Sequence, residues 1–239
     1  MHDTNRFEIL LENDDFIAIN KPSGMLTIPD RIGKEESLQS ILRQSRERIL
    51  VVHRIDRDTS GLVMFAKTEQ SHRDLCSLFE SREIEKYYVG LVHGKPASQE
   101  GQIDAAIAEH PSKNGKMVVN SKGKPSATDY EVLESFRQYS WLKFRIHTGR
   151  THQIRVHMNH IGHSIVCDDL YGDPDPIYIS SLKRNYKLSK KEETERPILG
   201  RLALHSYSVR FNLGGKDYSI EAEVPKDLRA TLQQLRKHM

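Results

Sequence analysis

Asp56 is the residue whose surroundings in this sequence most favour chemistry by a carboxylate. It stands between Arg54 and Arg57, and neighbouring positive charge keeps an aspartate ionised. The Thr-Ser-Gly corner that follows offers hydroxyls and, at Gly61, a residue that can take positive φ where the chain turns sharply. An ionised carboxylate at such a turn can stabilise or capture an electron-poor carbon. A surface turn with a local Arg–Asp pair is the simpler alternative, and composition alone favours it.

The elements around Asp56 must place it on a turn. An apolar run with strand character, Leu62 to Ala66, follows directly. Earlier in the chain, Lys21 to Met25 contains a proline and a glycine and predicts another turn. Two strands, Phe7 to Leu11 and Phe16 to Asn20, precede that turn and are joined as a hairpin. The candidate carboxylate is thus expected on a turn that leads straight into a strand.

Helices are predicted where a capping residue or a stop signal borders an apolar stripe. Ser37 and Thr68 can each cap a helix start, and Gly162 can end a helix. The expected helices run from Leu38 to about Arg46, from Glu69 to about Ser81, from Thr151 to Gly162 and from about Lys226 to Lys237.

Further strands are predicted by alternating apolar residues. Glu85 to Gly94 has strand character, and Ala127 to Phe136 and Trp141 to His147 alternate as two antiparallel strands do. Near the end of the chain, a hairpin turns at Gly214-Gly215. The mixture of strands and helices predicts an α+β fold.

Length and composition limit the class of protein. At 239 residues the chain can bury a sizeable core and is most simply one domain, residues 1–239. No run approaches the ~18 apolar residues of a membrane span, and no apolar signal segment follows Met1, so we expect a cytoplasmic protein. Cys76 and Cys167 are too few for a disulfide scaffold. The net charge of +3 is compatible with a nucleic-acid partner but too small to establish one.

The order of residues from His53 to Leu62 closely resembles the HRLD-x-x-TSGL signature of the RluA family of pseudouridine synthases, with Ile55 in place of the leucine. Lys21 to Met25 resembles the KP-x-G element of the same family, and Glu85 to Gly94 resembles its EK-x-Y-x-A-L-V-x-G. Thr148 to Gly172 closely resembles TGR-x-HQIR-x-H followed by GH-x-I-x-x-D-x-x-YG. Together these segments extend over most of the chain.

The resemblance implies a fold and an activity. The implied architecture is a pseudouridine-synthase fold, with a largely antiparallel central sheet, flanking helices and a cleft across the sheet. The implied reaction detaches uracil at N1 and rejoins it through C5, without a cofactor. Nothing before Phe7 is long enough for the accessory S4-type RNA-binding domain of some relatives, and we expect residues 173–196 to be an exposed insertion.

The resemblance also implies roles for five residues. Asp56 is the implied catalytic aspartate, and Arg155 is expected to pair with it and keep it charged. Tyr88 is expected to lie against the uracil ring, with Ile154 packing on the base from the other side. Arg54 corresponds to the residue that fills the space left by a flipped-out base.

The expected partner is RNA. The layout is most similar to that of the family's namesake, RluA, which implies a tRNA anticodon stem-loop, 23S rRNA or both. We expect a monomer with no obligatory protein partner and no membrane association. The segment from His110 to Pro125 carries lysines and no acidic residue, and both RNA contact and a solvated loop are compatible with it.

A zinc site is an alternative, because histidines crowd the second long motif. We disfavour it because an HExxH-type pair is absent and no cysteine pair completes a ligand set, and we therefore expect no metal. The histidines are His147, His152, His157, His160 and His163.

Two other functional classes also compete. The stretch Asp58 to Gly61 is similar to the Asp-Thr-Gly of aspartic proteases, but an extra residue breaks the spacing and one copy occurs where two carboxylates are needed. A non-catalytic RNA-binding protein on the same fold is the more serious alternative. The joint presence of Asp56, Tyr88 and Arg155 argues against it.

Overall fold

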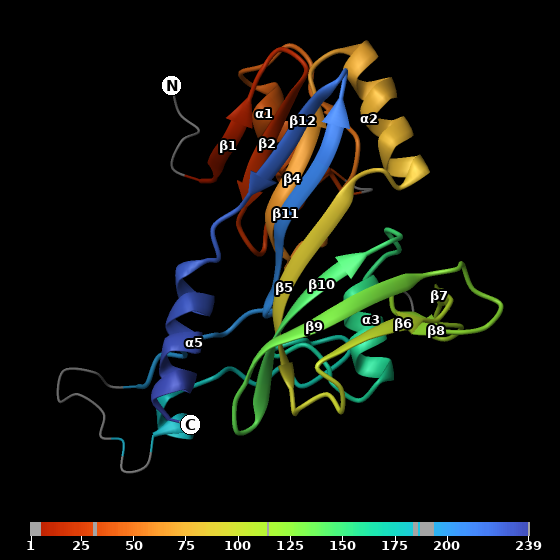
Figure 1. Ribbon diagram of the computed structural model, residues 1–239. Coiled ribbons are helices and arrows are strands. Elements are labelled where there is room, and N and C mark those ends of the chain that lie inside the picture. Colours follow the sequence, from red (N-terminus) through yellow and green to blue (C-terminus); the bar gives the residue numbers. More distant parts are fainter. Residues whose placement is uncertain (1–5, 31–32, 114, 184–185, 187–193, 239) are drawn as a thin grey trace. The chain divides into compact units, whose positions relative to one another are not determined.

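The protein combines helices with a large, mostly antiparallel sheet, which confirms the predicted fold class (Figure 1). The computed structural model describes residues 6–30, 33–113, 115–183, 186 and 194–238. The chain divides into two compact units, each assembled from separate segments. The prediction of a single catalytic domain stays a prediction. The first unit holds the described residues of Met1–Val89, Phe144–Thr151 and Leu204–Glu223, and the second those of Gly90–Lys143, His152–Ala203 and Val224–Met239.

Strands of the first unit pair in the order β1-β2-β4-β11, while β12 pairs with β11 and β3 with β4. The β4–β11 pair is parallel, at Ser60 and His205, and the β1–β2, β2–β4, β3–β4 and β11–β12 pairs are antiparallel. Both predicted hairpins are confirmed. The bounds are Glu8–Glu12 for β1, Phe16–Lys21 for β2, Leu50–Val51 for β3, Ser60–Ala66 for β4, Leu204–Leu213 for β11 and Lys216–Glu221 for β12.

Two capped helices belong to this unit, α1 (Leu38–Arg43) and α2 (Glu69–Ser81). Ser37 and Thr68 close capping boxes at their starts, as predicted. The helix α2 packs against β3, β4 and β11 (Figure 1), and its Leu75 is fully buried in the core. Full burial of a leucine stabilises the fold by about 2 kcal/mol. The predicted end of α1 near Arg46 is wrong, since the helix ends at Arg43.

The second unit is built around short strand pairs and a buried helix. The pairs β6–β9 and β7–β8 are antiparallel, and α3 packs against β8 and β9. No helix among the described residues is long and apolar enough to cross a membrane. The bounds are Glu100–Asp104 for β6, Ile107–Glu109 for β7, Met117–Val119 for β8, Ala127–Ser135 for β9, Gln153–His160 for α3, Ile179–Leu182 for α4 and Lys226–Lys237 for α5. Strands β5 (Glu85–His93) and β10 (Tyr139–Ile146) contribute residues to both units.

The start of α3 differs from the prediction. A helix from Thr151 was expected, but His152 takes φ 55° and ψ 23°, so regular helix begins at Gln153. A left-handed backbone cannot be part of a right-handed helix. The helix end agrees better with the sequence, because Gly162 follows with φ 83°, the conformation that glycine favours after a helix.

Two segments expected to be loops contain ordered contacts. Within the basic segment His110 to Pro125, residues 117–119 form β8. Within 173–196, Ile177 is 2% exposed and forms a β-bridge with Leu199. Residues 184–185 and 187–193 of the predicted insertion lie outside the described residues.

Candidate active site

Asp56 lies on the loop between β3 and β4, where the sequence placed it. The residue is half-buried, whereas Arg54 is exposed and Ile55 is buried. Exposure of Arg54 beside a half-buried carboxylate leaves both side chains accessible to a large ligand. The site therefore begins on a surface loop that the neighbouring turn has to hold.

Lys21 holds that loop through its ammonium group. The residue is fully buried, at the end of β2. Its Nζ donates hydrogen bonds to the carbonyl oxygens of Pro22 at 3.0 Å, Met25 at 2.7 Å and Arg57 at 2.8 Å. A buried ammonium is tolerated only when its donors are satisfied, and three carbonyls match its three N–H groups. Lys21 thus joins the proline turn to the residue that follows Asp56.

Three further bonds join the same two segments. Thr27 Oγ1 donates to the carbonyl of Ile55 at 2.8 Å, and Ser23 Oγ donates to the carbonyl of Asp58 at 2.6 Å. The Gly24 N–H donates to the carbonyl of Arg57 at 3.0 Å. Carbonyls on both sides of Asp56 are therefore fixed, so the backbone that carries the carboxylate is held mostly by side-chain donors of the proline turn and of Thr27.

Arg57 has a surface role in this arrangement. Its guanidinium donates to the carbonyl of Gly24 at 3.2 Å and forms an ion pair with Glu35 at 3.1 Å. Both side chains of the ion pair are about half exposed, so the pair itself adds little stability. Its contact with Gly24 again fixes the proline turn against the Asp56 loop.

The start of β4 is fixed by His53 and Gly61. His53 Nε2 accepts the Met64 N–H at 3.0 Å, and its ring stacks on Phe79 with 4.6 Å between centroids. Burial, with a smaller contribution from Lys86, lowers the pKa of His53 to about 3. Gly61 takes φ 109°, as the sequence predicted for this corner.

Tyr88 lies in β5 within the first unit, the unit that also contains Asp56. It is 9% exposed, and its side chain hydrogen-bonds to that of Ser206. Burial chiefly, and the negative charge of Asp56 in addition, raise the pKa of Tyr88 to about 12. The phenol therefore stays protonated at physiological pH, and it lies within electrostatic reach of Asp56.

Ile154 and Arg155 lie in α3, in the second unit, and both are buried. Arg155 Nε donates to Asp168 Oδ2 at 2.8 Å and its Nη2 donates to Asp168 Oδ1 at 2.7 Å. Such a bidentate pair fixes the plane of the guanidinium. The expected pairing of Arg155 with Asp56 stays a prediction.

Asp168 is the site residue that sequence reasoning missed. It is fully buried, and its Oδ1 also accepts the N–H groups of Leu170 and Tyr171 at 3.0 Å each. A signal was available, because Asp168 occupies the aspartate position of the D-x-x-YG pattern. No role had been attached to that position.

Within the cluster of histidines, His152, His157 and His163 make hydrogen bonds. His157 contacts Thr128 Oγ1 and the carbonyl of Ala105, each at 2.9 Å, and His152 Nδ1 lies 2.8 Å from the hydroxyl of Tyr171. Among the residues that the structure describes, no three His, Cys, Asp or Glu side chains gather as a metal-ligand set.

Comparisons with known proteins agree with one another. Residues 15–160 match the family model described as RNA pseudouridylate synthase. The chain is 34% identical over 239 residues to "Ribosomal large subunit pseudouridine synthase D" of Nitrosomonas europaea. The aligned region covers 96% of this chain and 65% of that protein. It is 35% identical over 255 residues to "Uncharacterized RNA pseudouridine synthase" of Chlorobaculum parvum, covering 97% of this chain and 75% of that one.

A solved structure shows the same likeness. The human protein "RNA Pseudouridylate Synthase Domain Containing 1" superposes with a TM-score of 0.71 at 25% identity, over 96% of this chain and 94% of that one. The similarity thus extends over nearly the whole of both structures, whereas the chain spans about two thirds of the Nitrosomonas protein.

Proposed function

Because this chain belongs to the RNA pseudouridylate synthase family, we propose that it isomerises uridine in RNA to pseudouridine, with Asp56 as the catalytic carboxylate. In this reaction the bond from the sugar C1′ to N1 of uracil breaks and a bond from C1′ to C5 forms. The C5 proton leaves and N1 gains a proton, so no cofactor is consumed. The observation that carries the proposal is the Asp56 loop, whose backbone is fixed on both sides of the carboxylate by Thr27 and Lys21.

The proposed chemistry uses Asp56 as an ionised group. Its carboxylate stabilises or captures the electron-poor sugar carbon as the glycosidic bond breaks. Arg155 is proposed to keep that carboxylate charged. Its bidentate contact with Asp168 supports such a role, because a guanidinium already fixed in direction loses little freedom when it binds an anion.

Tyr88 and Ile154 are proposed to hold the uracil. With a pKa near 12, Tyr88 is a hydrogen-bond donor and a stacking surface, and it is not a base at neutral pH. Ile154 is 5% exposed and offers an aliphatic contact surface. An aromatic and an aliphatic face on opposite sides of a base select for a flat ring without reading its sequence context.

Arg54 is proposed to occupy the space left by the target base. A uridine stacked in a stem cannot reach a carboxylate on the protein, so it has to be flipped out. Arg54 is exposed and lies on the Asp56 loop, which supports this role. We expect Arg54→Ala to slow modification of structured RNA at least tenfold and to leave a short single-stranded substrate less affected. Equal rates for wild type and variant on structured RNA would show that Arg54 does not have this role in base flipping.

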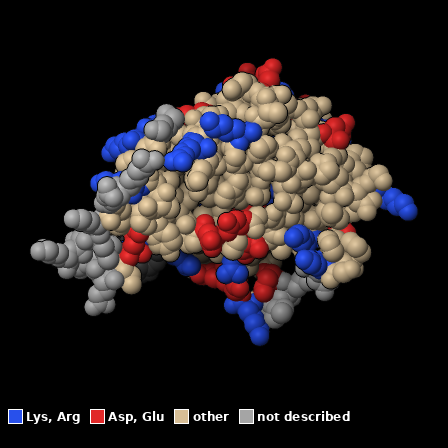
Figure 2. Space-filling view, turned by 90° about the horizontal axis from the view of Figure 1, so that it is seen from below, with Lys and Arg blue, Asp and Glu red and all other residues tan. Residues whose placement is uncertain are grey.

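The RNA of the large ribosomal subunit is the proposed substrate. The name of the Nitrosomonas relative refers to that subunit. A tRNA anticodon stem-loop is the alternative that the layout of the motifs implies. Charge does not choose between them, since both are polyanions. Figure 2 shows Lys and Arg side chains grouped at the upper left of the face in view and mixed with Asp and Glu lower down, and the net charge is only +3. We propose that the protein acts as a monomer in the cytoplasm, where ribosomes are assembled.

The test is tritium release from RNA that carries 5-tritiated uridine. Wild type, Asp56→Asn and the matched control Asp58→Asn are incubated side by side with 23S rRNA and with bulk tRNA. We expect release from the 23S rRNA, abolished by Asp56→Asn and retained within about fivefold by Asp58→Asn. Loss of activity in both variants would assign the effect to the loop and not to Asp56. Binding of RNA without tritium release by the wild type would favour a non-catalytic RNA-binding protein.

A further inference from the structure

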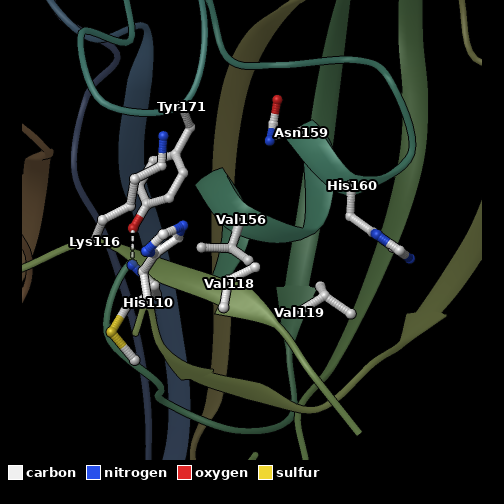
Figure 3. Close-up of a pocket in the computed structure, with 9 residues that line it drawn as sticks. His110, Lys116, Val118, Val119, Val156, Asn159, His160 and Tyr171 are labelled. Atoms are coloured by element: carbon white, nitrogen blue, oxygen red, sulfur yellow. Dashed lines mark hydrogen bonds between the residues drawn. The ribbon is translucent and has the colours of Figure 1, made fainter. Parts of the chain in front are cut away.

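A small pocket lies in the second unit, between the β7–β8 hairpin and α3 (Figure 3). Its volume is about 140 Å³. Three valines line it, Val118 and Val119 from β8 and Val156 from α3. Within the described part of the chain, the lining does not include Asp56, Tyr88 or Arg155. The pocket is therefore distinct from the proposed catalytic residues.

Polar side chains surround this apolar lining. His110 and Lys116 flank the turn of the hairpin, and Asn159 and His160 come from the last turn of α3 (Figure 3). Both α3 residues are exposed. Together the four polar residues provide an amide, two imidazoles and an ammonium around a surface of valine methyl groups. Among the described lining residues none is acidic. This mixture suits a flat heterocycle with polar edges that is attached to an anionic group.

Tyr171 gives the pocket a rigid wall. It is 6% exposed, its hydroxyl accepts the Met117 N–H at 2.8 Å, and it lies 2.8 Å from His152 Nδ1. Lys116 Nζ lies 5.3 Å from the centre of the Tyr171 ring, a cation–π contact. This contact positions the ammonium at the pocket, as a preformed site requires.

Volume and charge restrict the ligand. Pockets for drug-sized molecules begin at about 300 Å³, so this one has room for about a single base. The segment that forms one side, His110 to Pro125, holds Lys113, Lys116, Lys122 and Lys124 and no acidic residue. Clustered lysines favour phosphate, and a lysine contact to a phosphate carries no sequence information.

We propose that this pocket binds one unstacked base of the RNA, a nucleotide other than the target uridine, with its phosphate near Lys116. The valines contact the face of the base, Asn159 and the histidines meet its edge, and Lys116 neutralises the adjacent phosphate. Single-stranded loops supply such bases, because their nucleotides can be extruded without breaking pairs. This inference rests on the proposed function, since it takes RNA as the ligand.

The experiment blocks the pocket from its exposed side. Asn159→Phe fills it without replacing a buried residue, whereas Asn159→Ala removes only the contact of the amide with the base edge and leaves the pocket open. Dissociation constants are measured by filter binding with radiolabelled 23S rRNA transcript and with bulk tRNA, and kcat and KM are measured by tritium release. We expect Asn159→Phe to raise Kd and KM at least fivefold with kcat within twofold, and Asn159→Ala to change Kd at most threefold.

A second pair of variants tests the phosphate contact. Lys116→Gln is expected to raise Kd and to reduce the slope of log Kd against log salt by about 1. Lys113→Gln, exposed on the same turn but outside the lining, is expected to raise Kd less than Lys116→Gln does, and equal effects of the two would assign the loss to the charge of the segment and not to the pocket. Thermal melting of each variant checks the fold, and a rise in Kd that accompanies a lower melting temperature counts against the pocket.

The outcomes separate this inference from the proposed function. If the wild type releases tritium and Asn159→Phe binds and reacts as the wild type does, the pocket proposal is overturned and the function stands. If Asn159→Phe weakens binding but the wild type releases no tritium, the pocket stands and the activity does not. A wild type that binds neither RNA overturns the pocket as well.

Discussion

The carboxylate of Asp168 accepts two hydrogen bonds from the guanidinium of Arg155, of 2.7 and 2.8 Å. Both side chains are less than 5% exposed. Neither charge could be buried in this way alone, because desolvation of an unpaired ion is costly. The pair therefore fixes the direction of the arginine on which the proposed chemistry depends. In the proposed mechanism, Asp168 is therefore a positioning residue, one that acts through Arg155.

Asp168→Asn is expected to lower the free energy of unfolding by about 3 kcal/mol, because it removes the buried carboxylate of the bidentate pair with Arg155. Asp169→Asn is the matched control. Its side chain is 77% exposed and lies 3.4 Å from Arg155, so we expect a loss below about 0.5 kcal/mol. Urea unfolding of both variants measures the difference. Similar losses for the two would show that the buried pair adds nothing beyond surface charge.

Lys21→Met is expected to destabilise the protein by about 3 kcal/mol, because three carbonyls lose a charged donor. Tritium release should fall at least tenfold, since the loop that carries Asp56 is no longer fixed. Ser23→Ala removes one hydrogen bond, to the carbonyl of Asp58, and should cost about 1 kcal/mol. A Lys21→Met protein with wild-type turnover would mean that the loop holds its shape without the ammonium.

Gly61→Ala is expected to cost more than about 3 kcal/mol or to prevent folding. At φ 109°, a Cβ on Gly61 would lie 2.2 Å from the backbone oxygen of Ser206, where the parallel β4–β11 pair leaves no room. Gly215→Ala has a similarly left-handed φ, 82°, but open space around its Cβ, so about 1 kcal/mol is expected there. Thermal melts followed by circular dichroism measure the loss of stability in each variant. Equal losses would mean that backbone strain, and not the close contact with Ser206, causes the effect.

His53 predicts a pH dependence of stability. Its pKa is about 3 in the folded protein and about 6.5 when unfolded, so the unfolded state binds more protons between these values. The stability is therefore complete above pH 6.5 and is lost as the pH falls toward 3. From pH 7.5 to 5.5 the wild type should lose about 1 kcal/mol more than His53→Gln, whose amide oxygen can still accept the Met64 N–H. Urea unfolding of both proteins at the two pH values measures these losses. Identical losses for wild type and His53→Gln would mean that folding does not lower the pKa of His53.

Local signals in the sequence predicted much of the fold. The bounds of α2 and α5 and both hairpins agree with the structure, because capping residues and glycine turns act over a few neighbouring positions. The start of α3 was wrong by two residues, since the left-handed His152 is held by its contact with the hydroxyl of Tyr171. A backbone conformation that depends on a residue distant in sequence leaves no local pattern.

Of the candidate site, the sequence predicted the residues that belong to motifs, and it did not predict the contacts that hold them. Motif order predicted Asp56 and Tyr88, and their catalytic roles stay predictions; the charge of Asp56 is one of the causes that raise the pKa of Tyr88. Lys21 was read only as part of a turn, because no pattern in one sequence shows that a lysine is buried against three carbonyls. Asp168 was missed although it occupies the aspartate of the D-x-x-YG pattern, because the pattern does not show that this aspartate pairs with Arg155, 13 positions earlier in the chain.

The contacts between the proline turn and the Asp56 loop mostly involve main-chain carbonyls, at Ile55, Arg57 and Asp58. Such bonds do not depend on which side chains the loop carries. The backbone of the loop is thus held independently of its outward side chains, and Arg54 can be varied without loosening the proposed catalytic carboxylate. A substitution at Arg54 should therefore change base flipping alone, while Lys21, Ser23 and Thr27 keep the backbone of the loop in place.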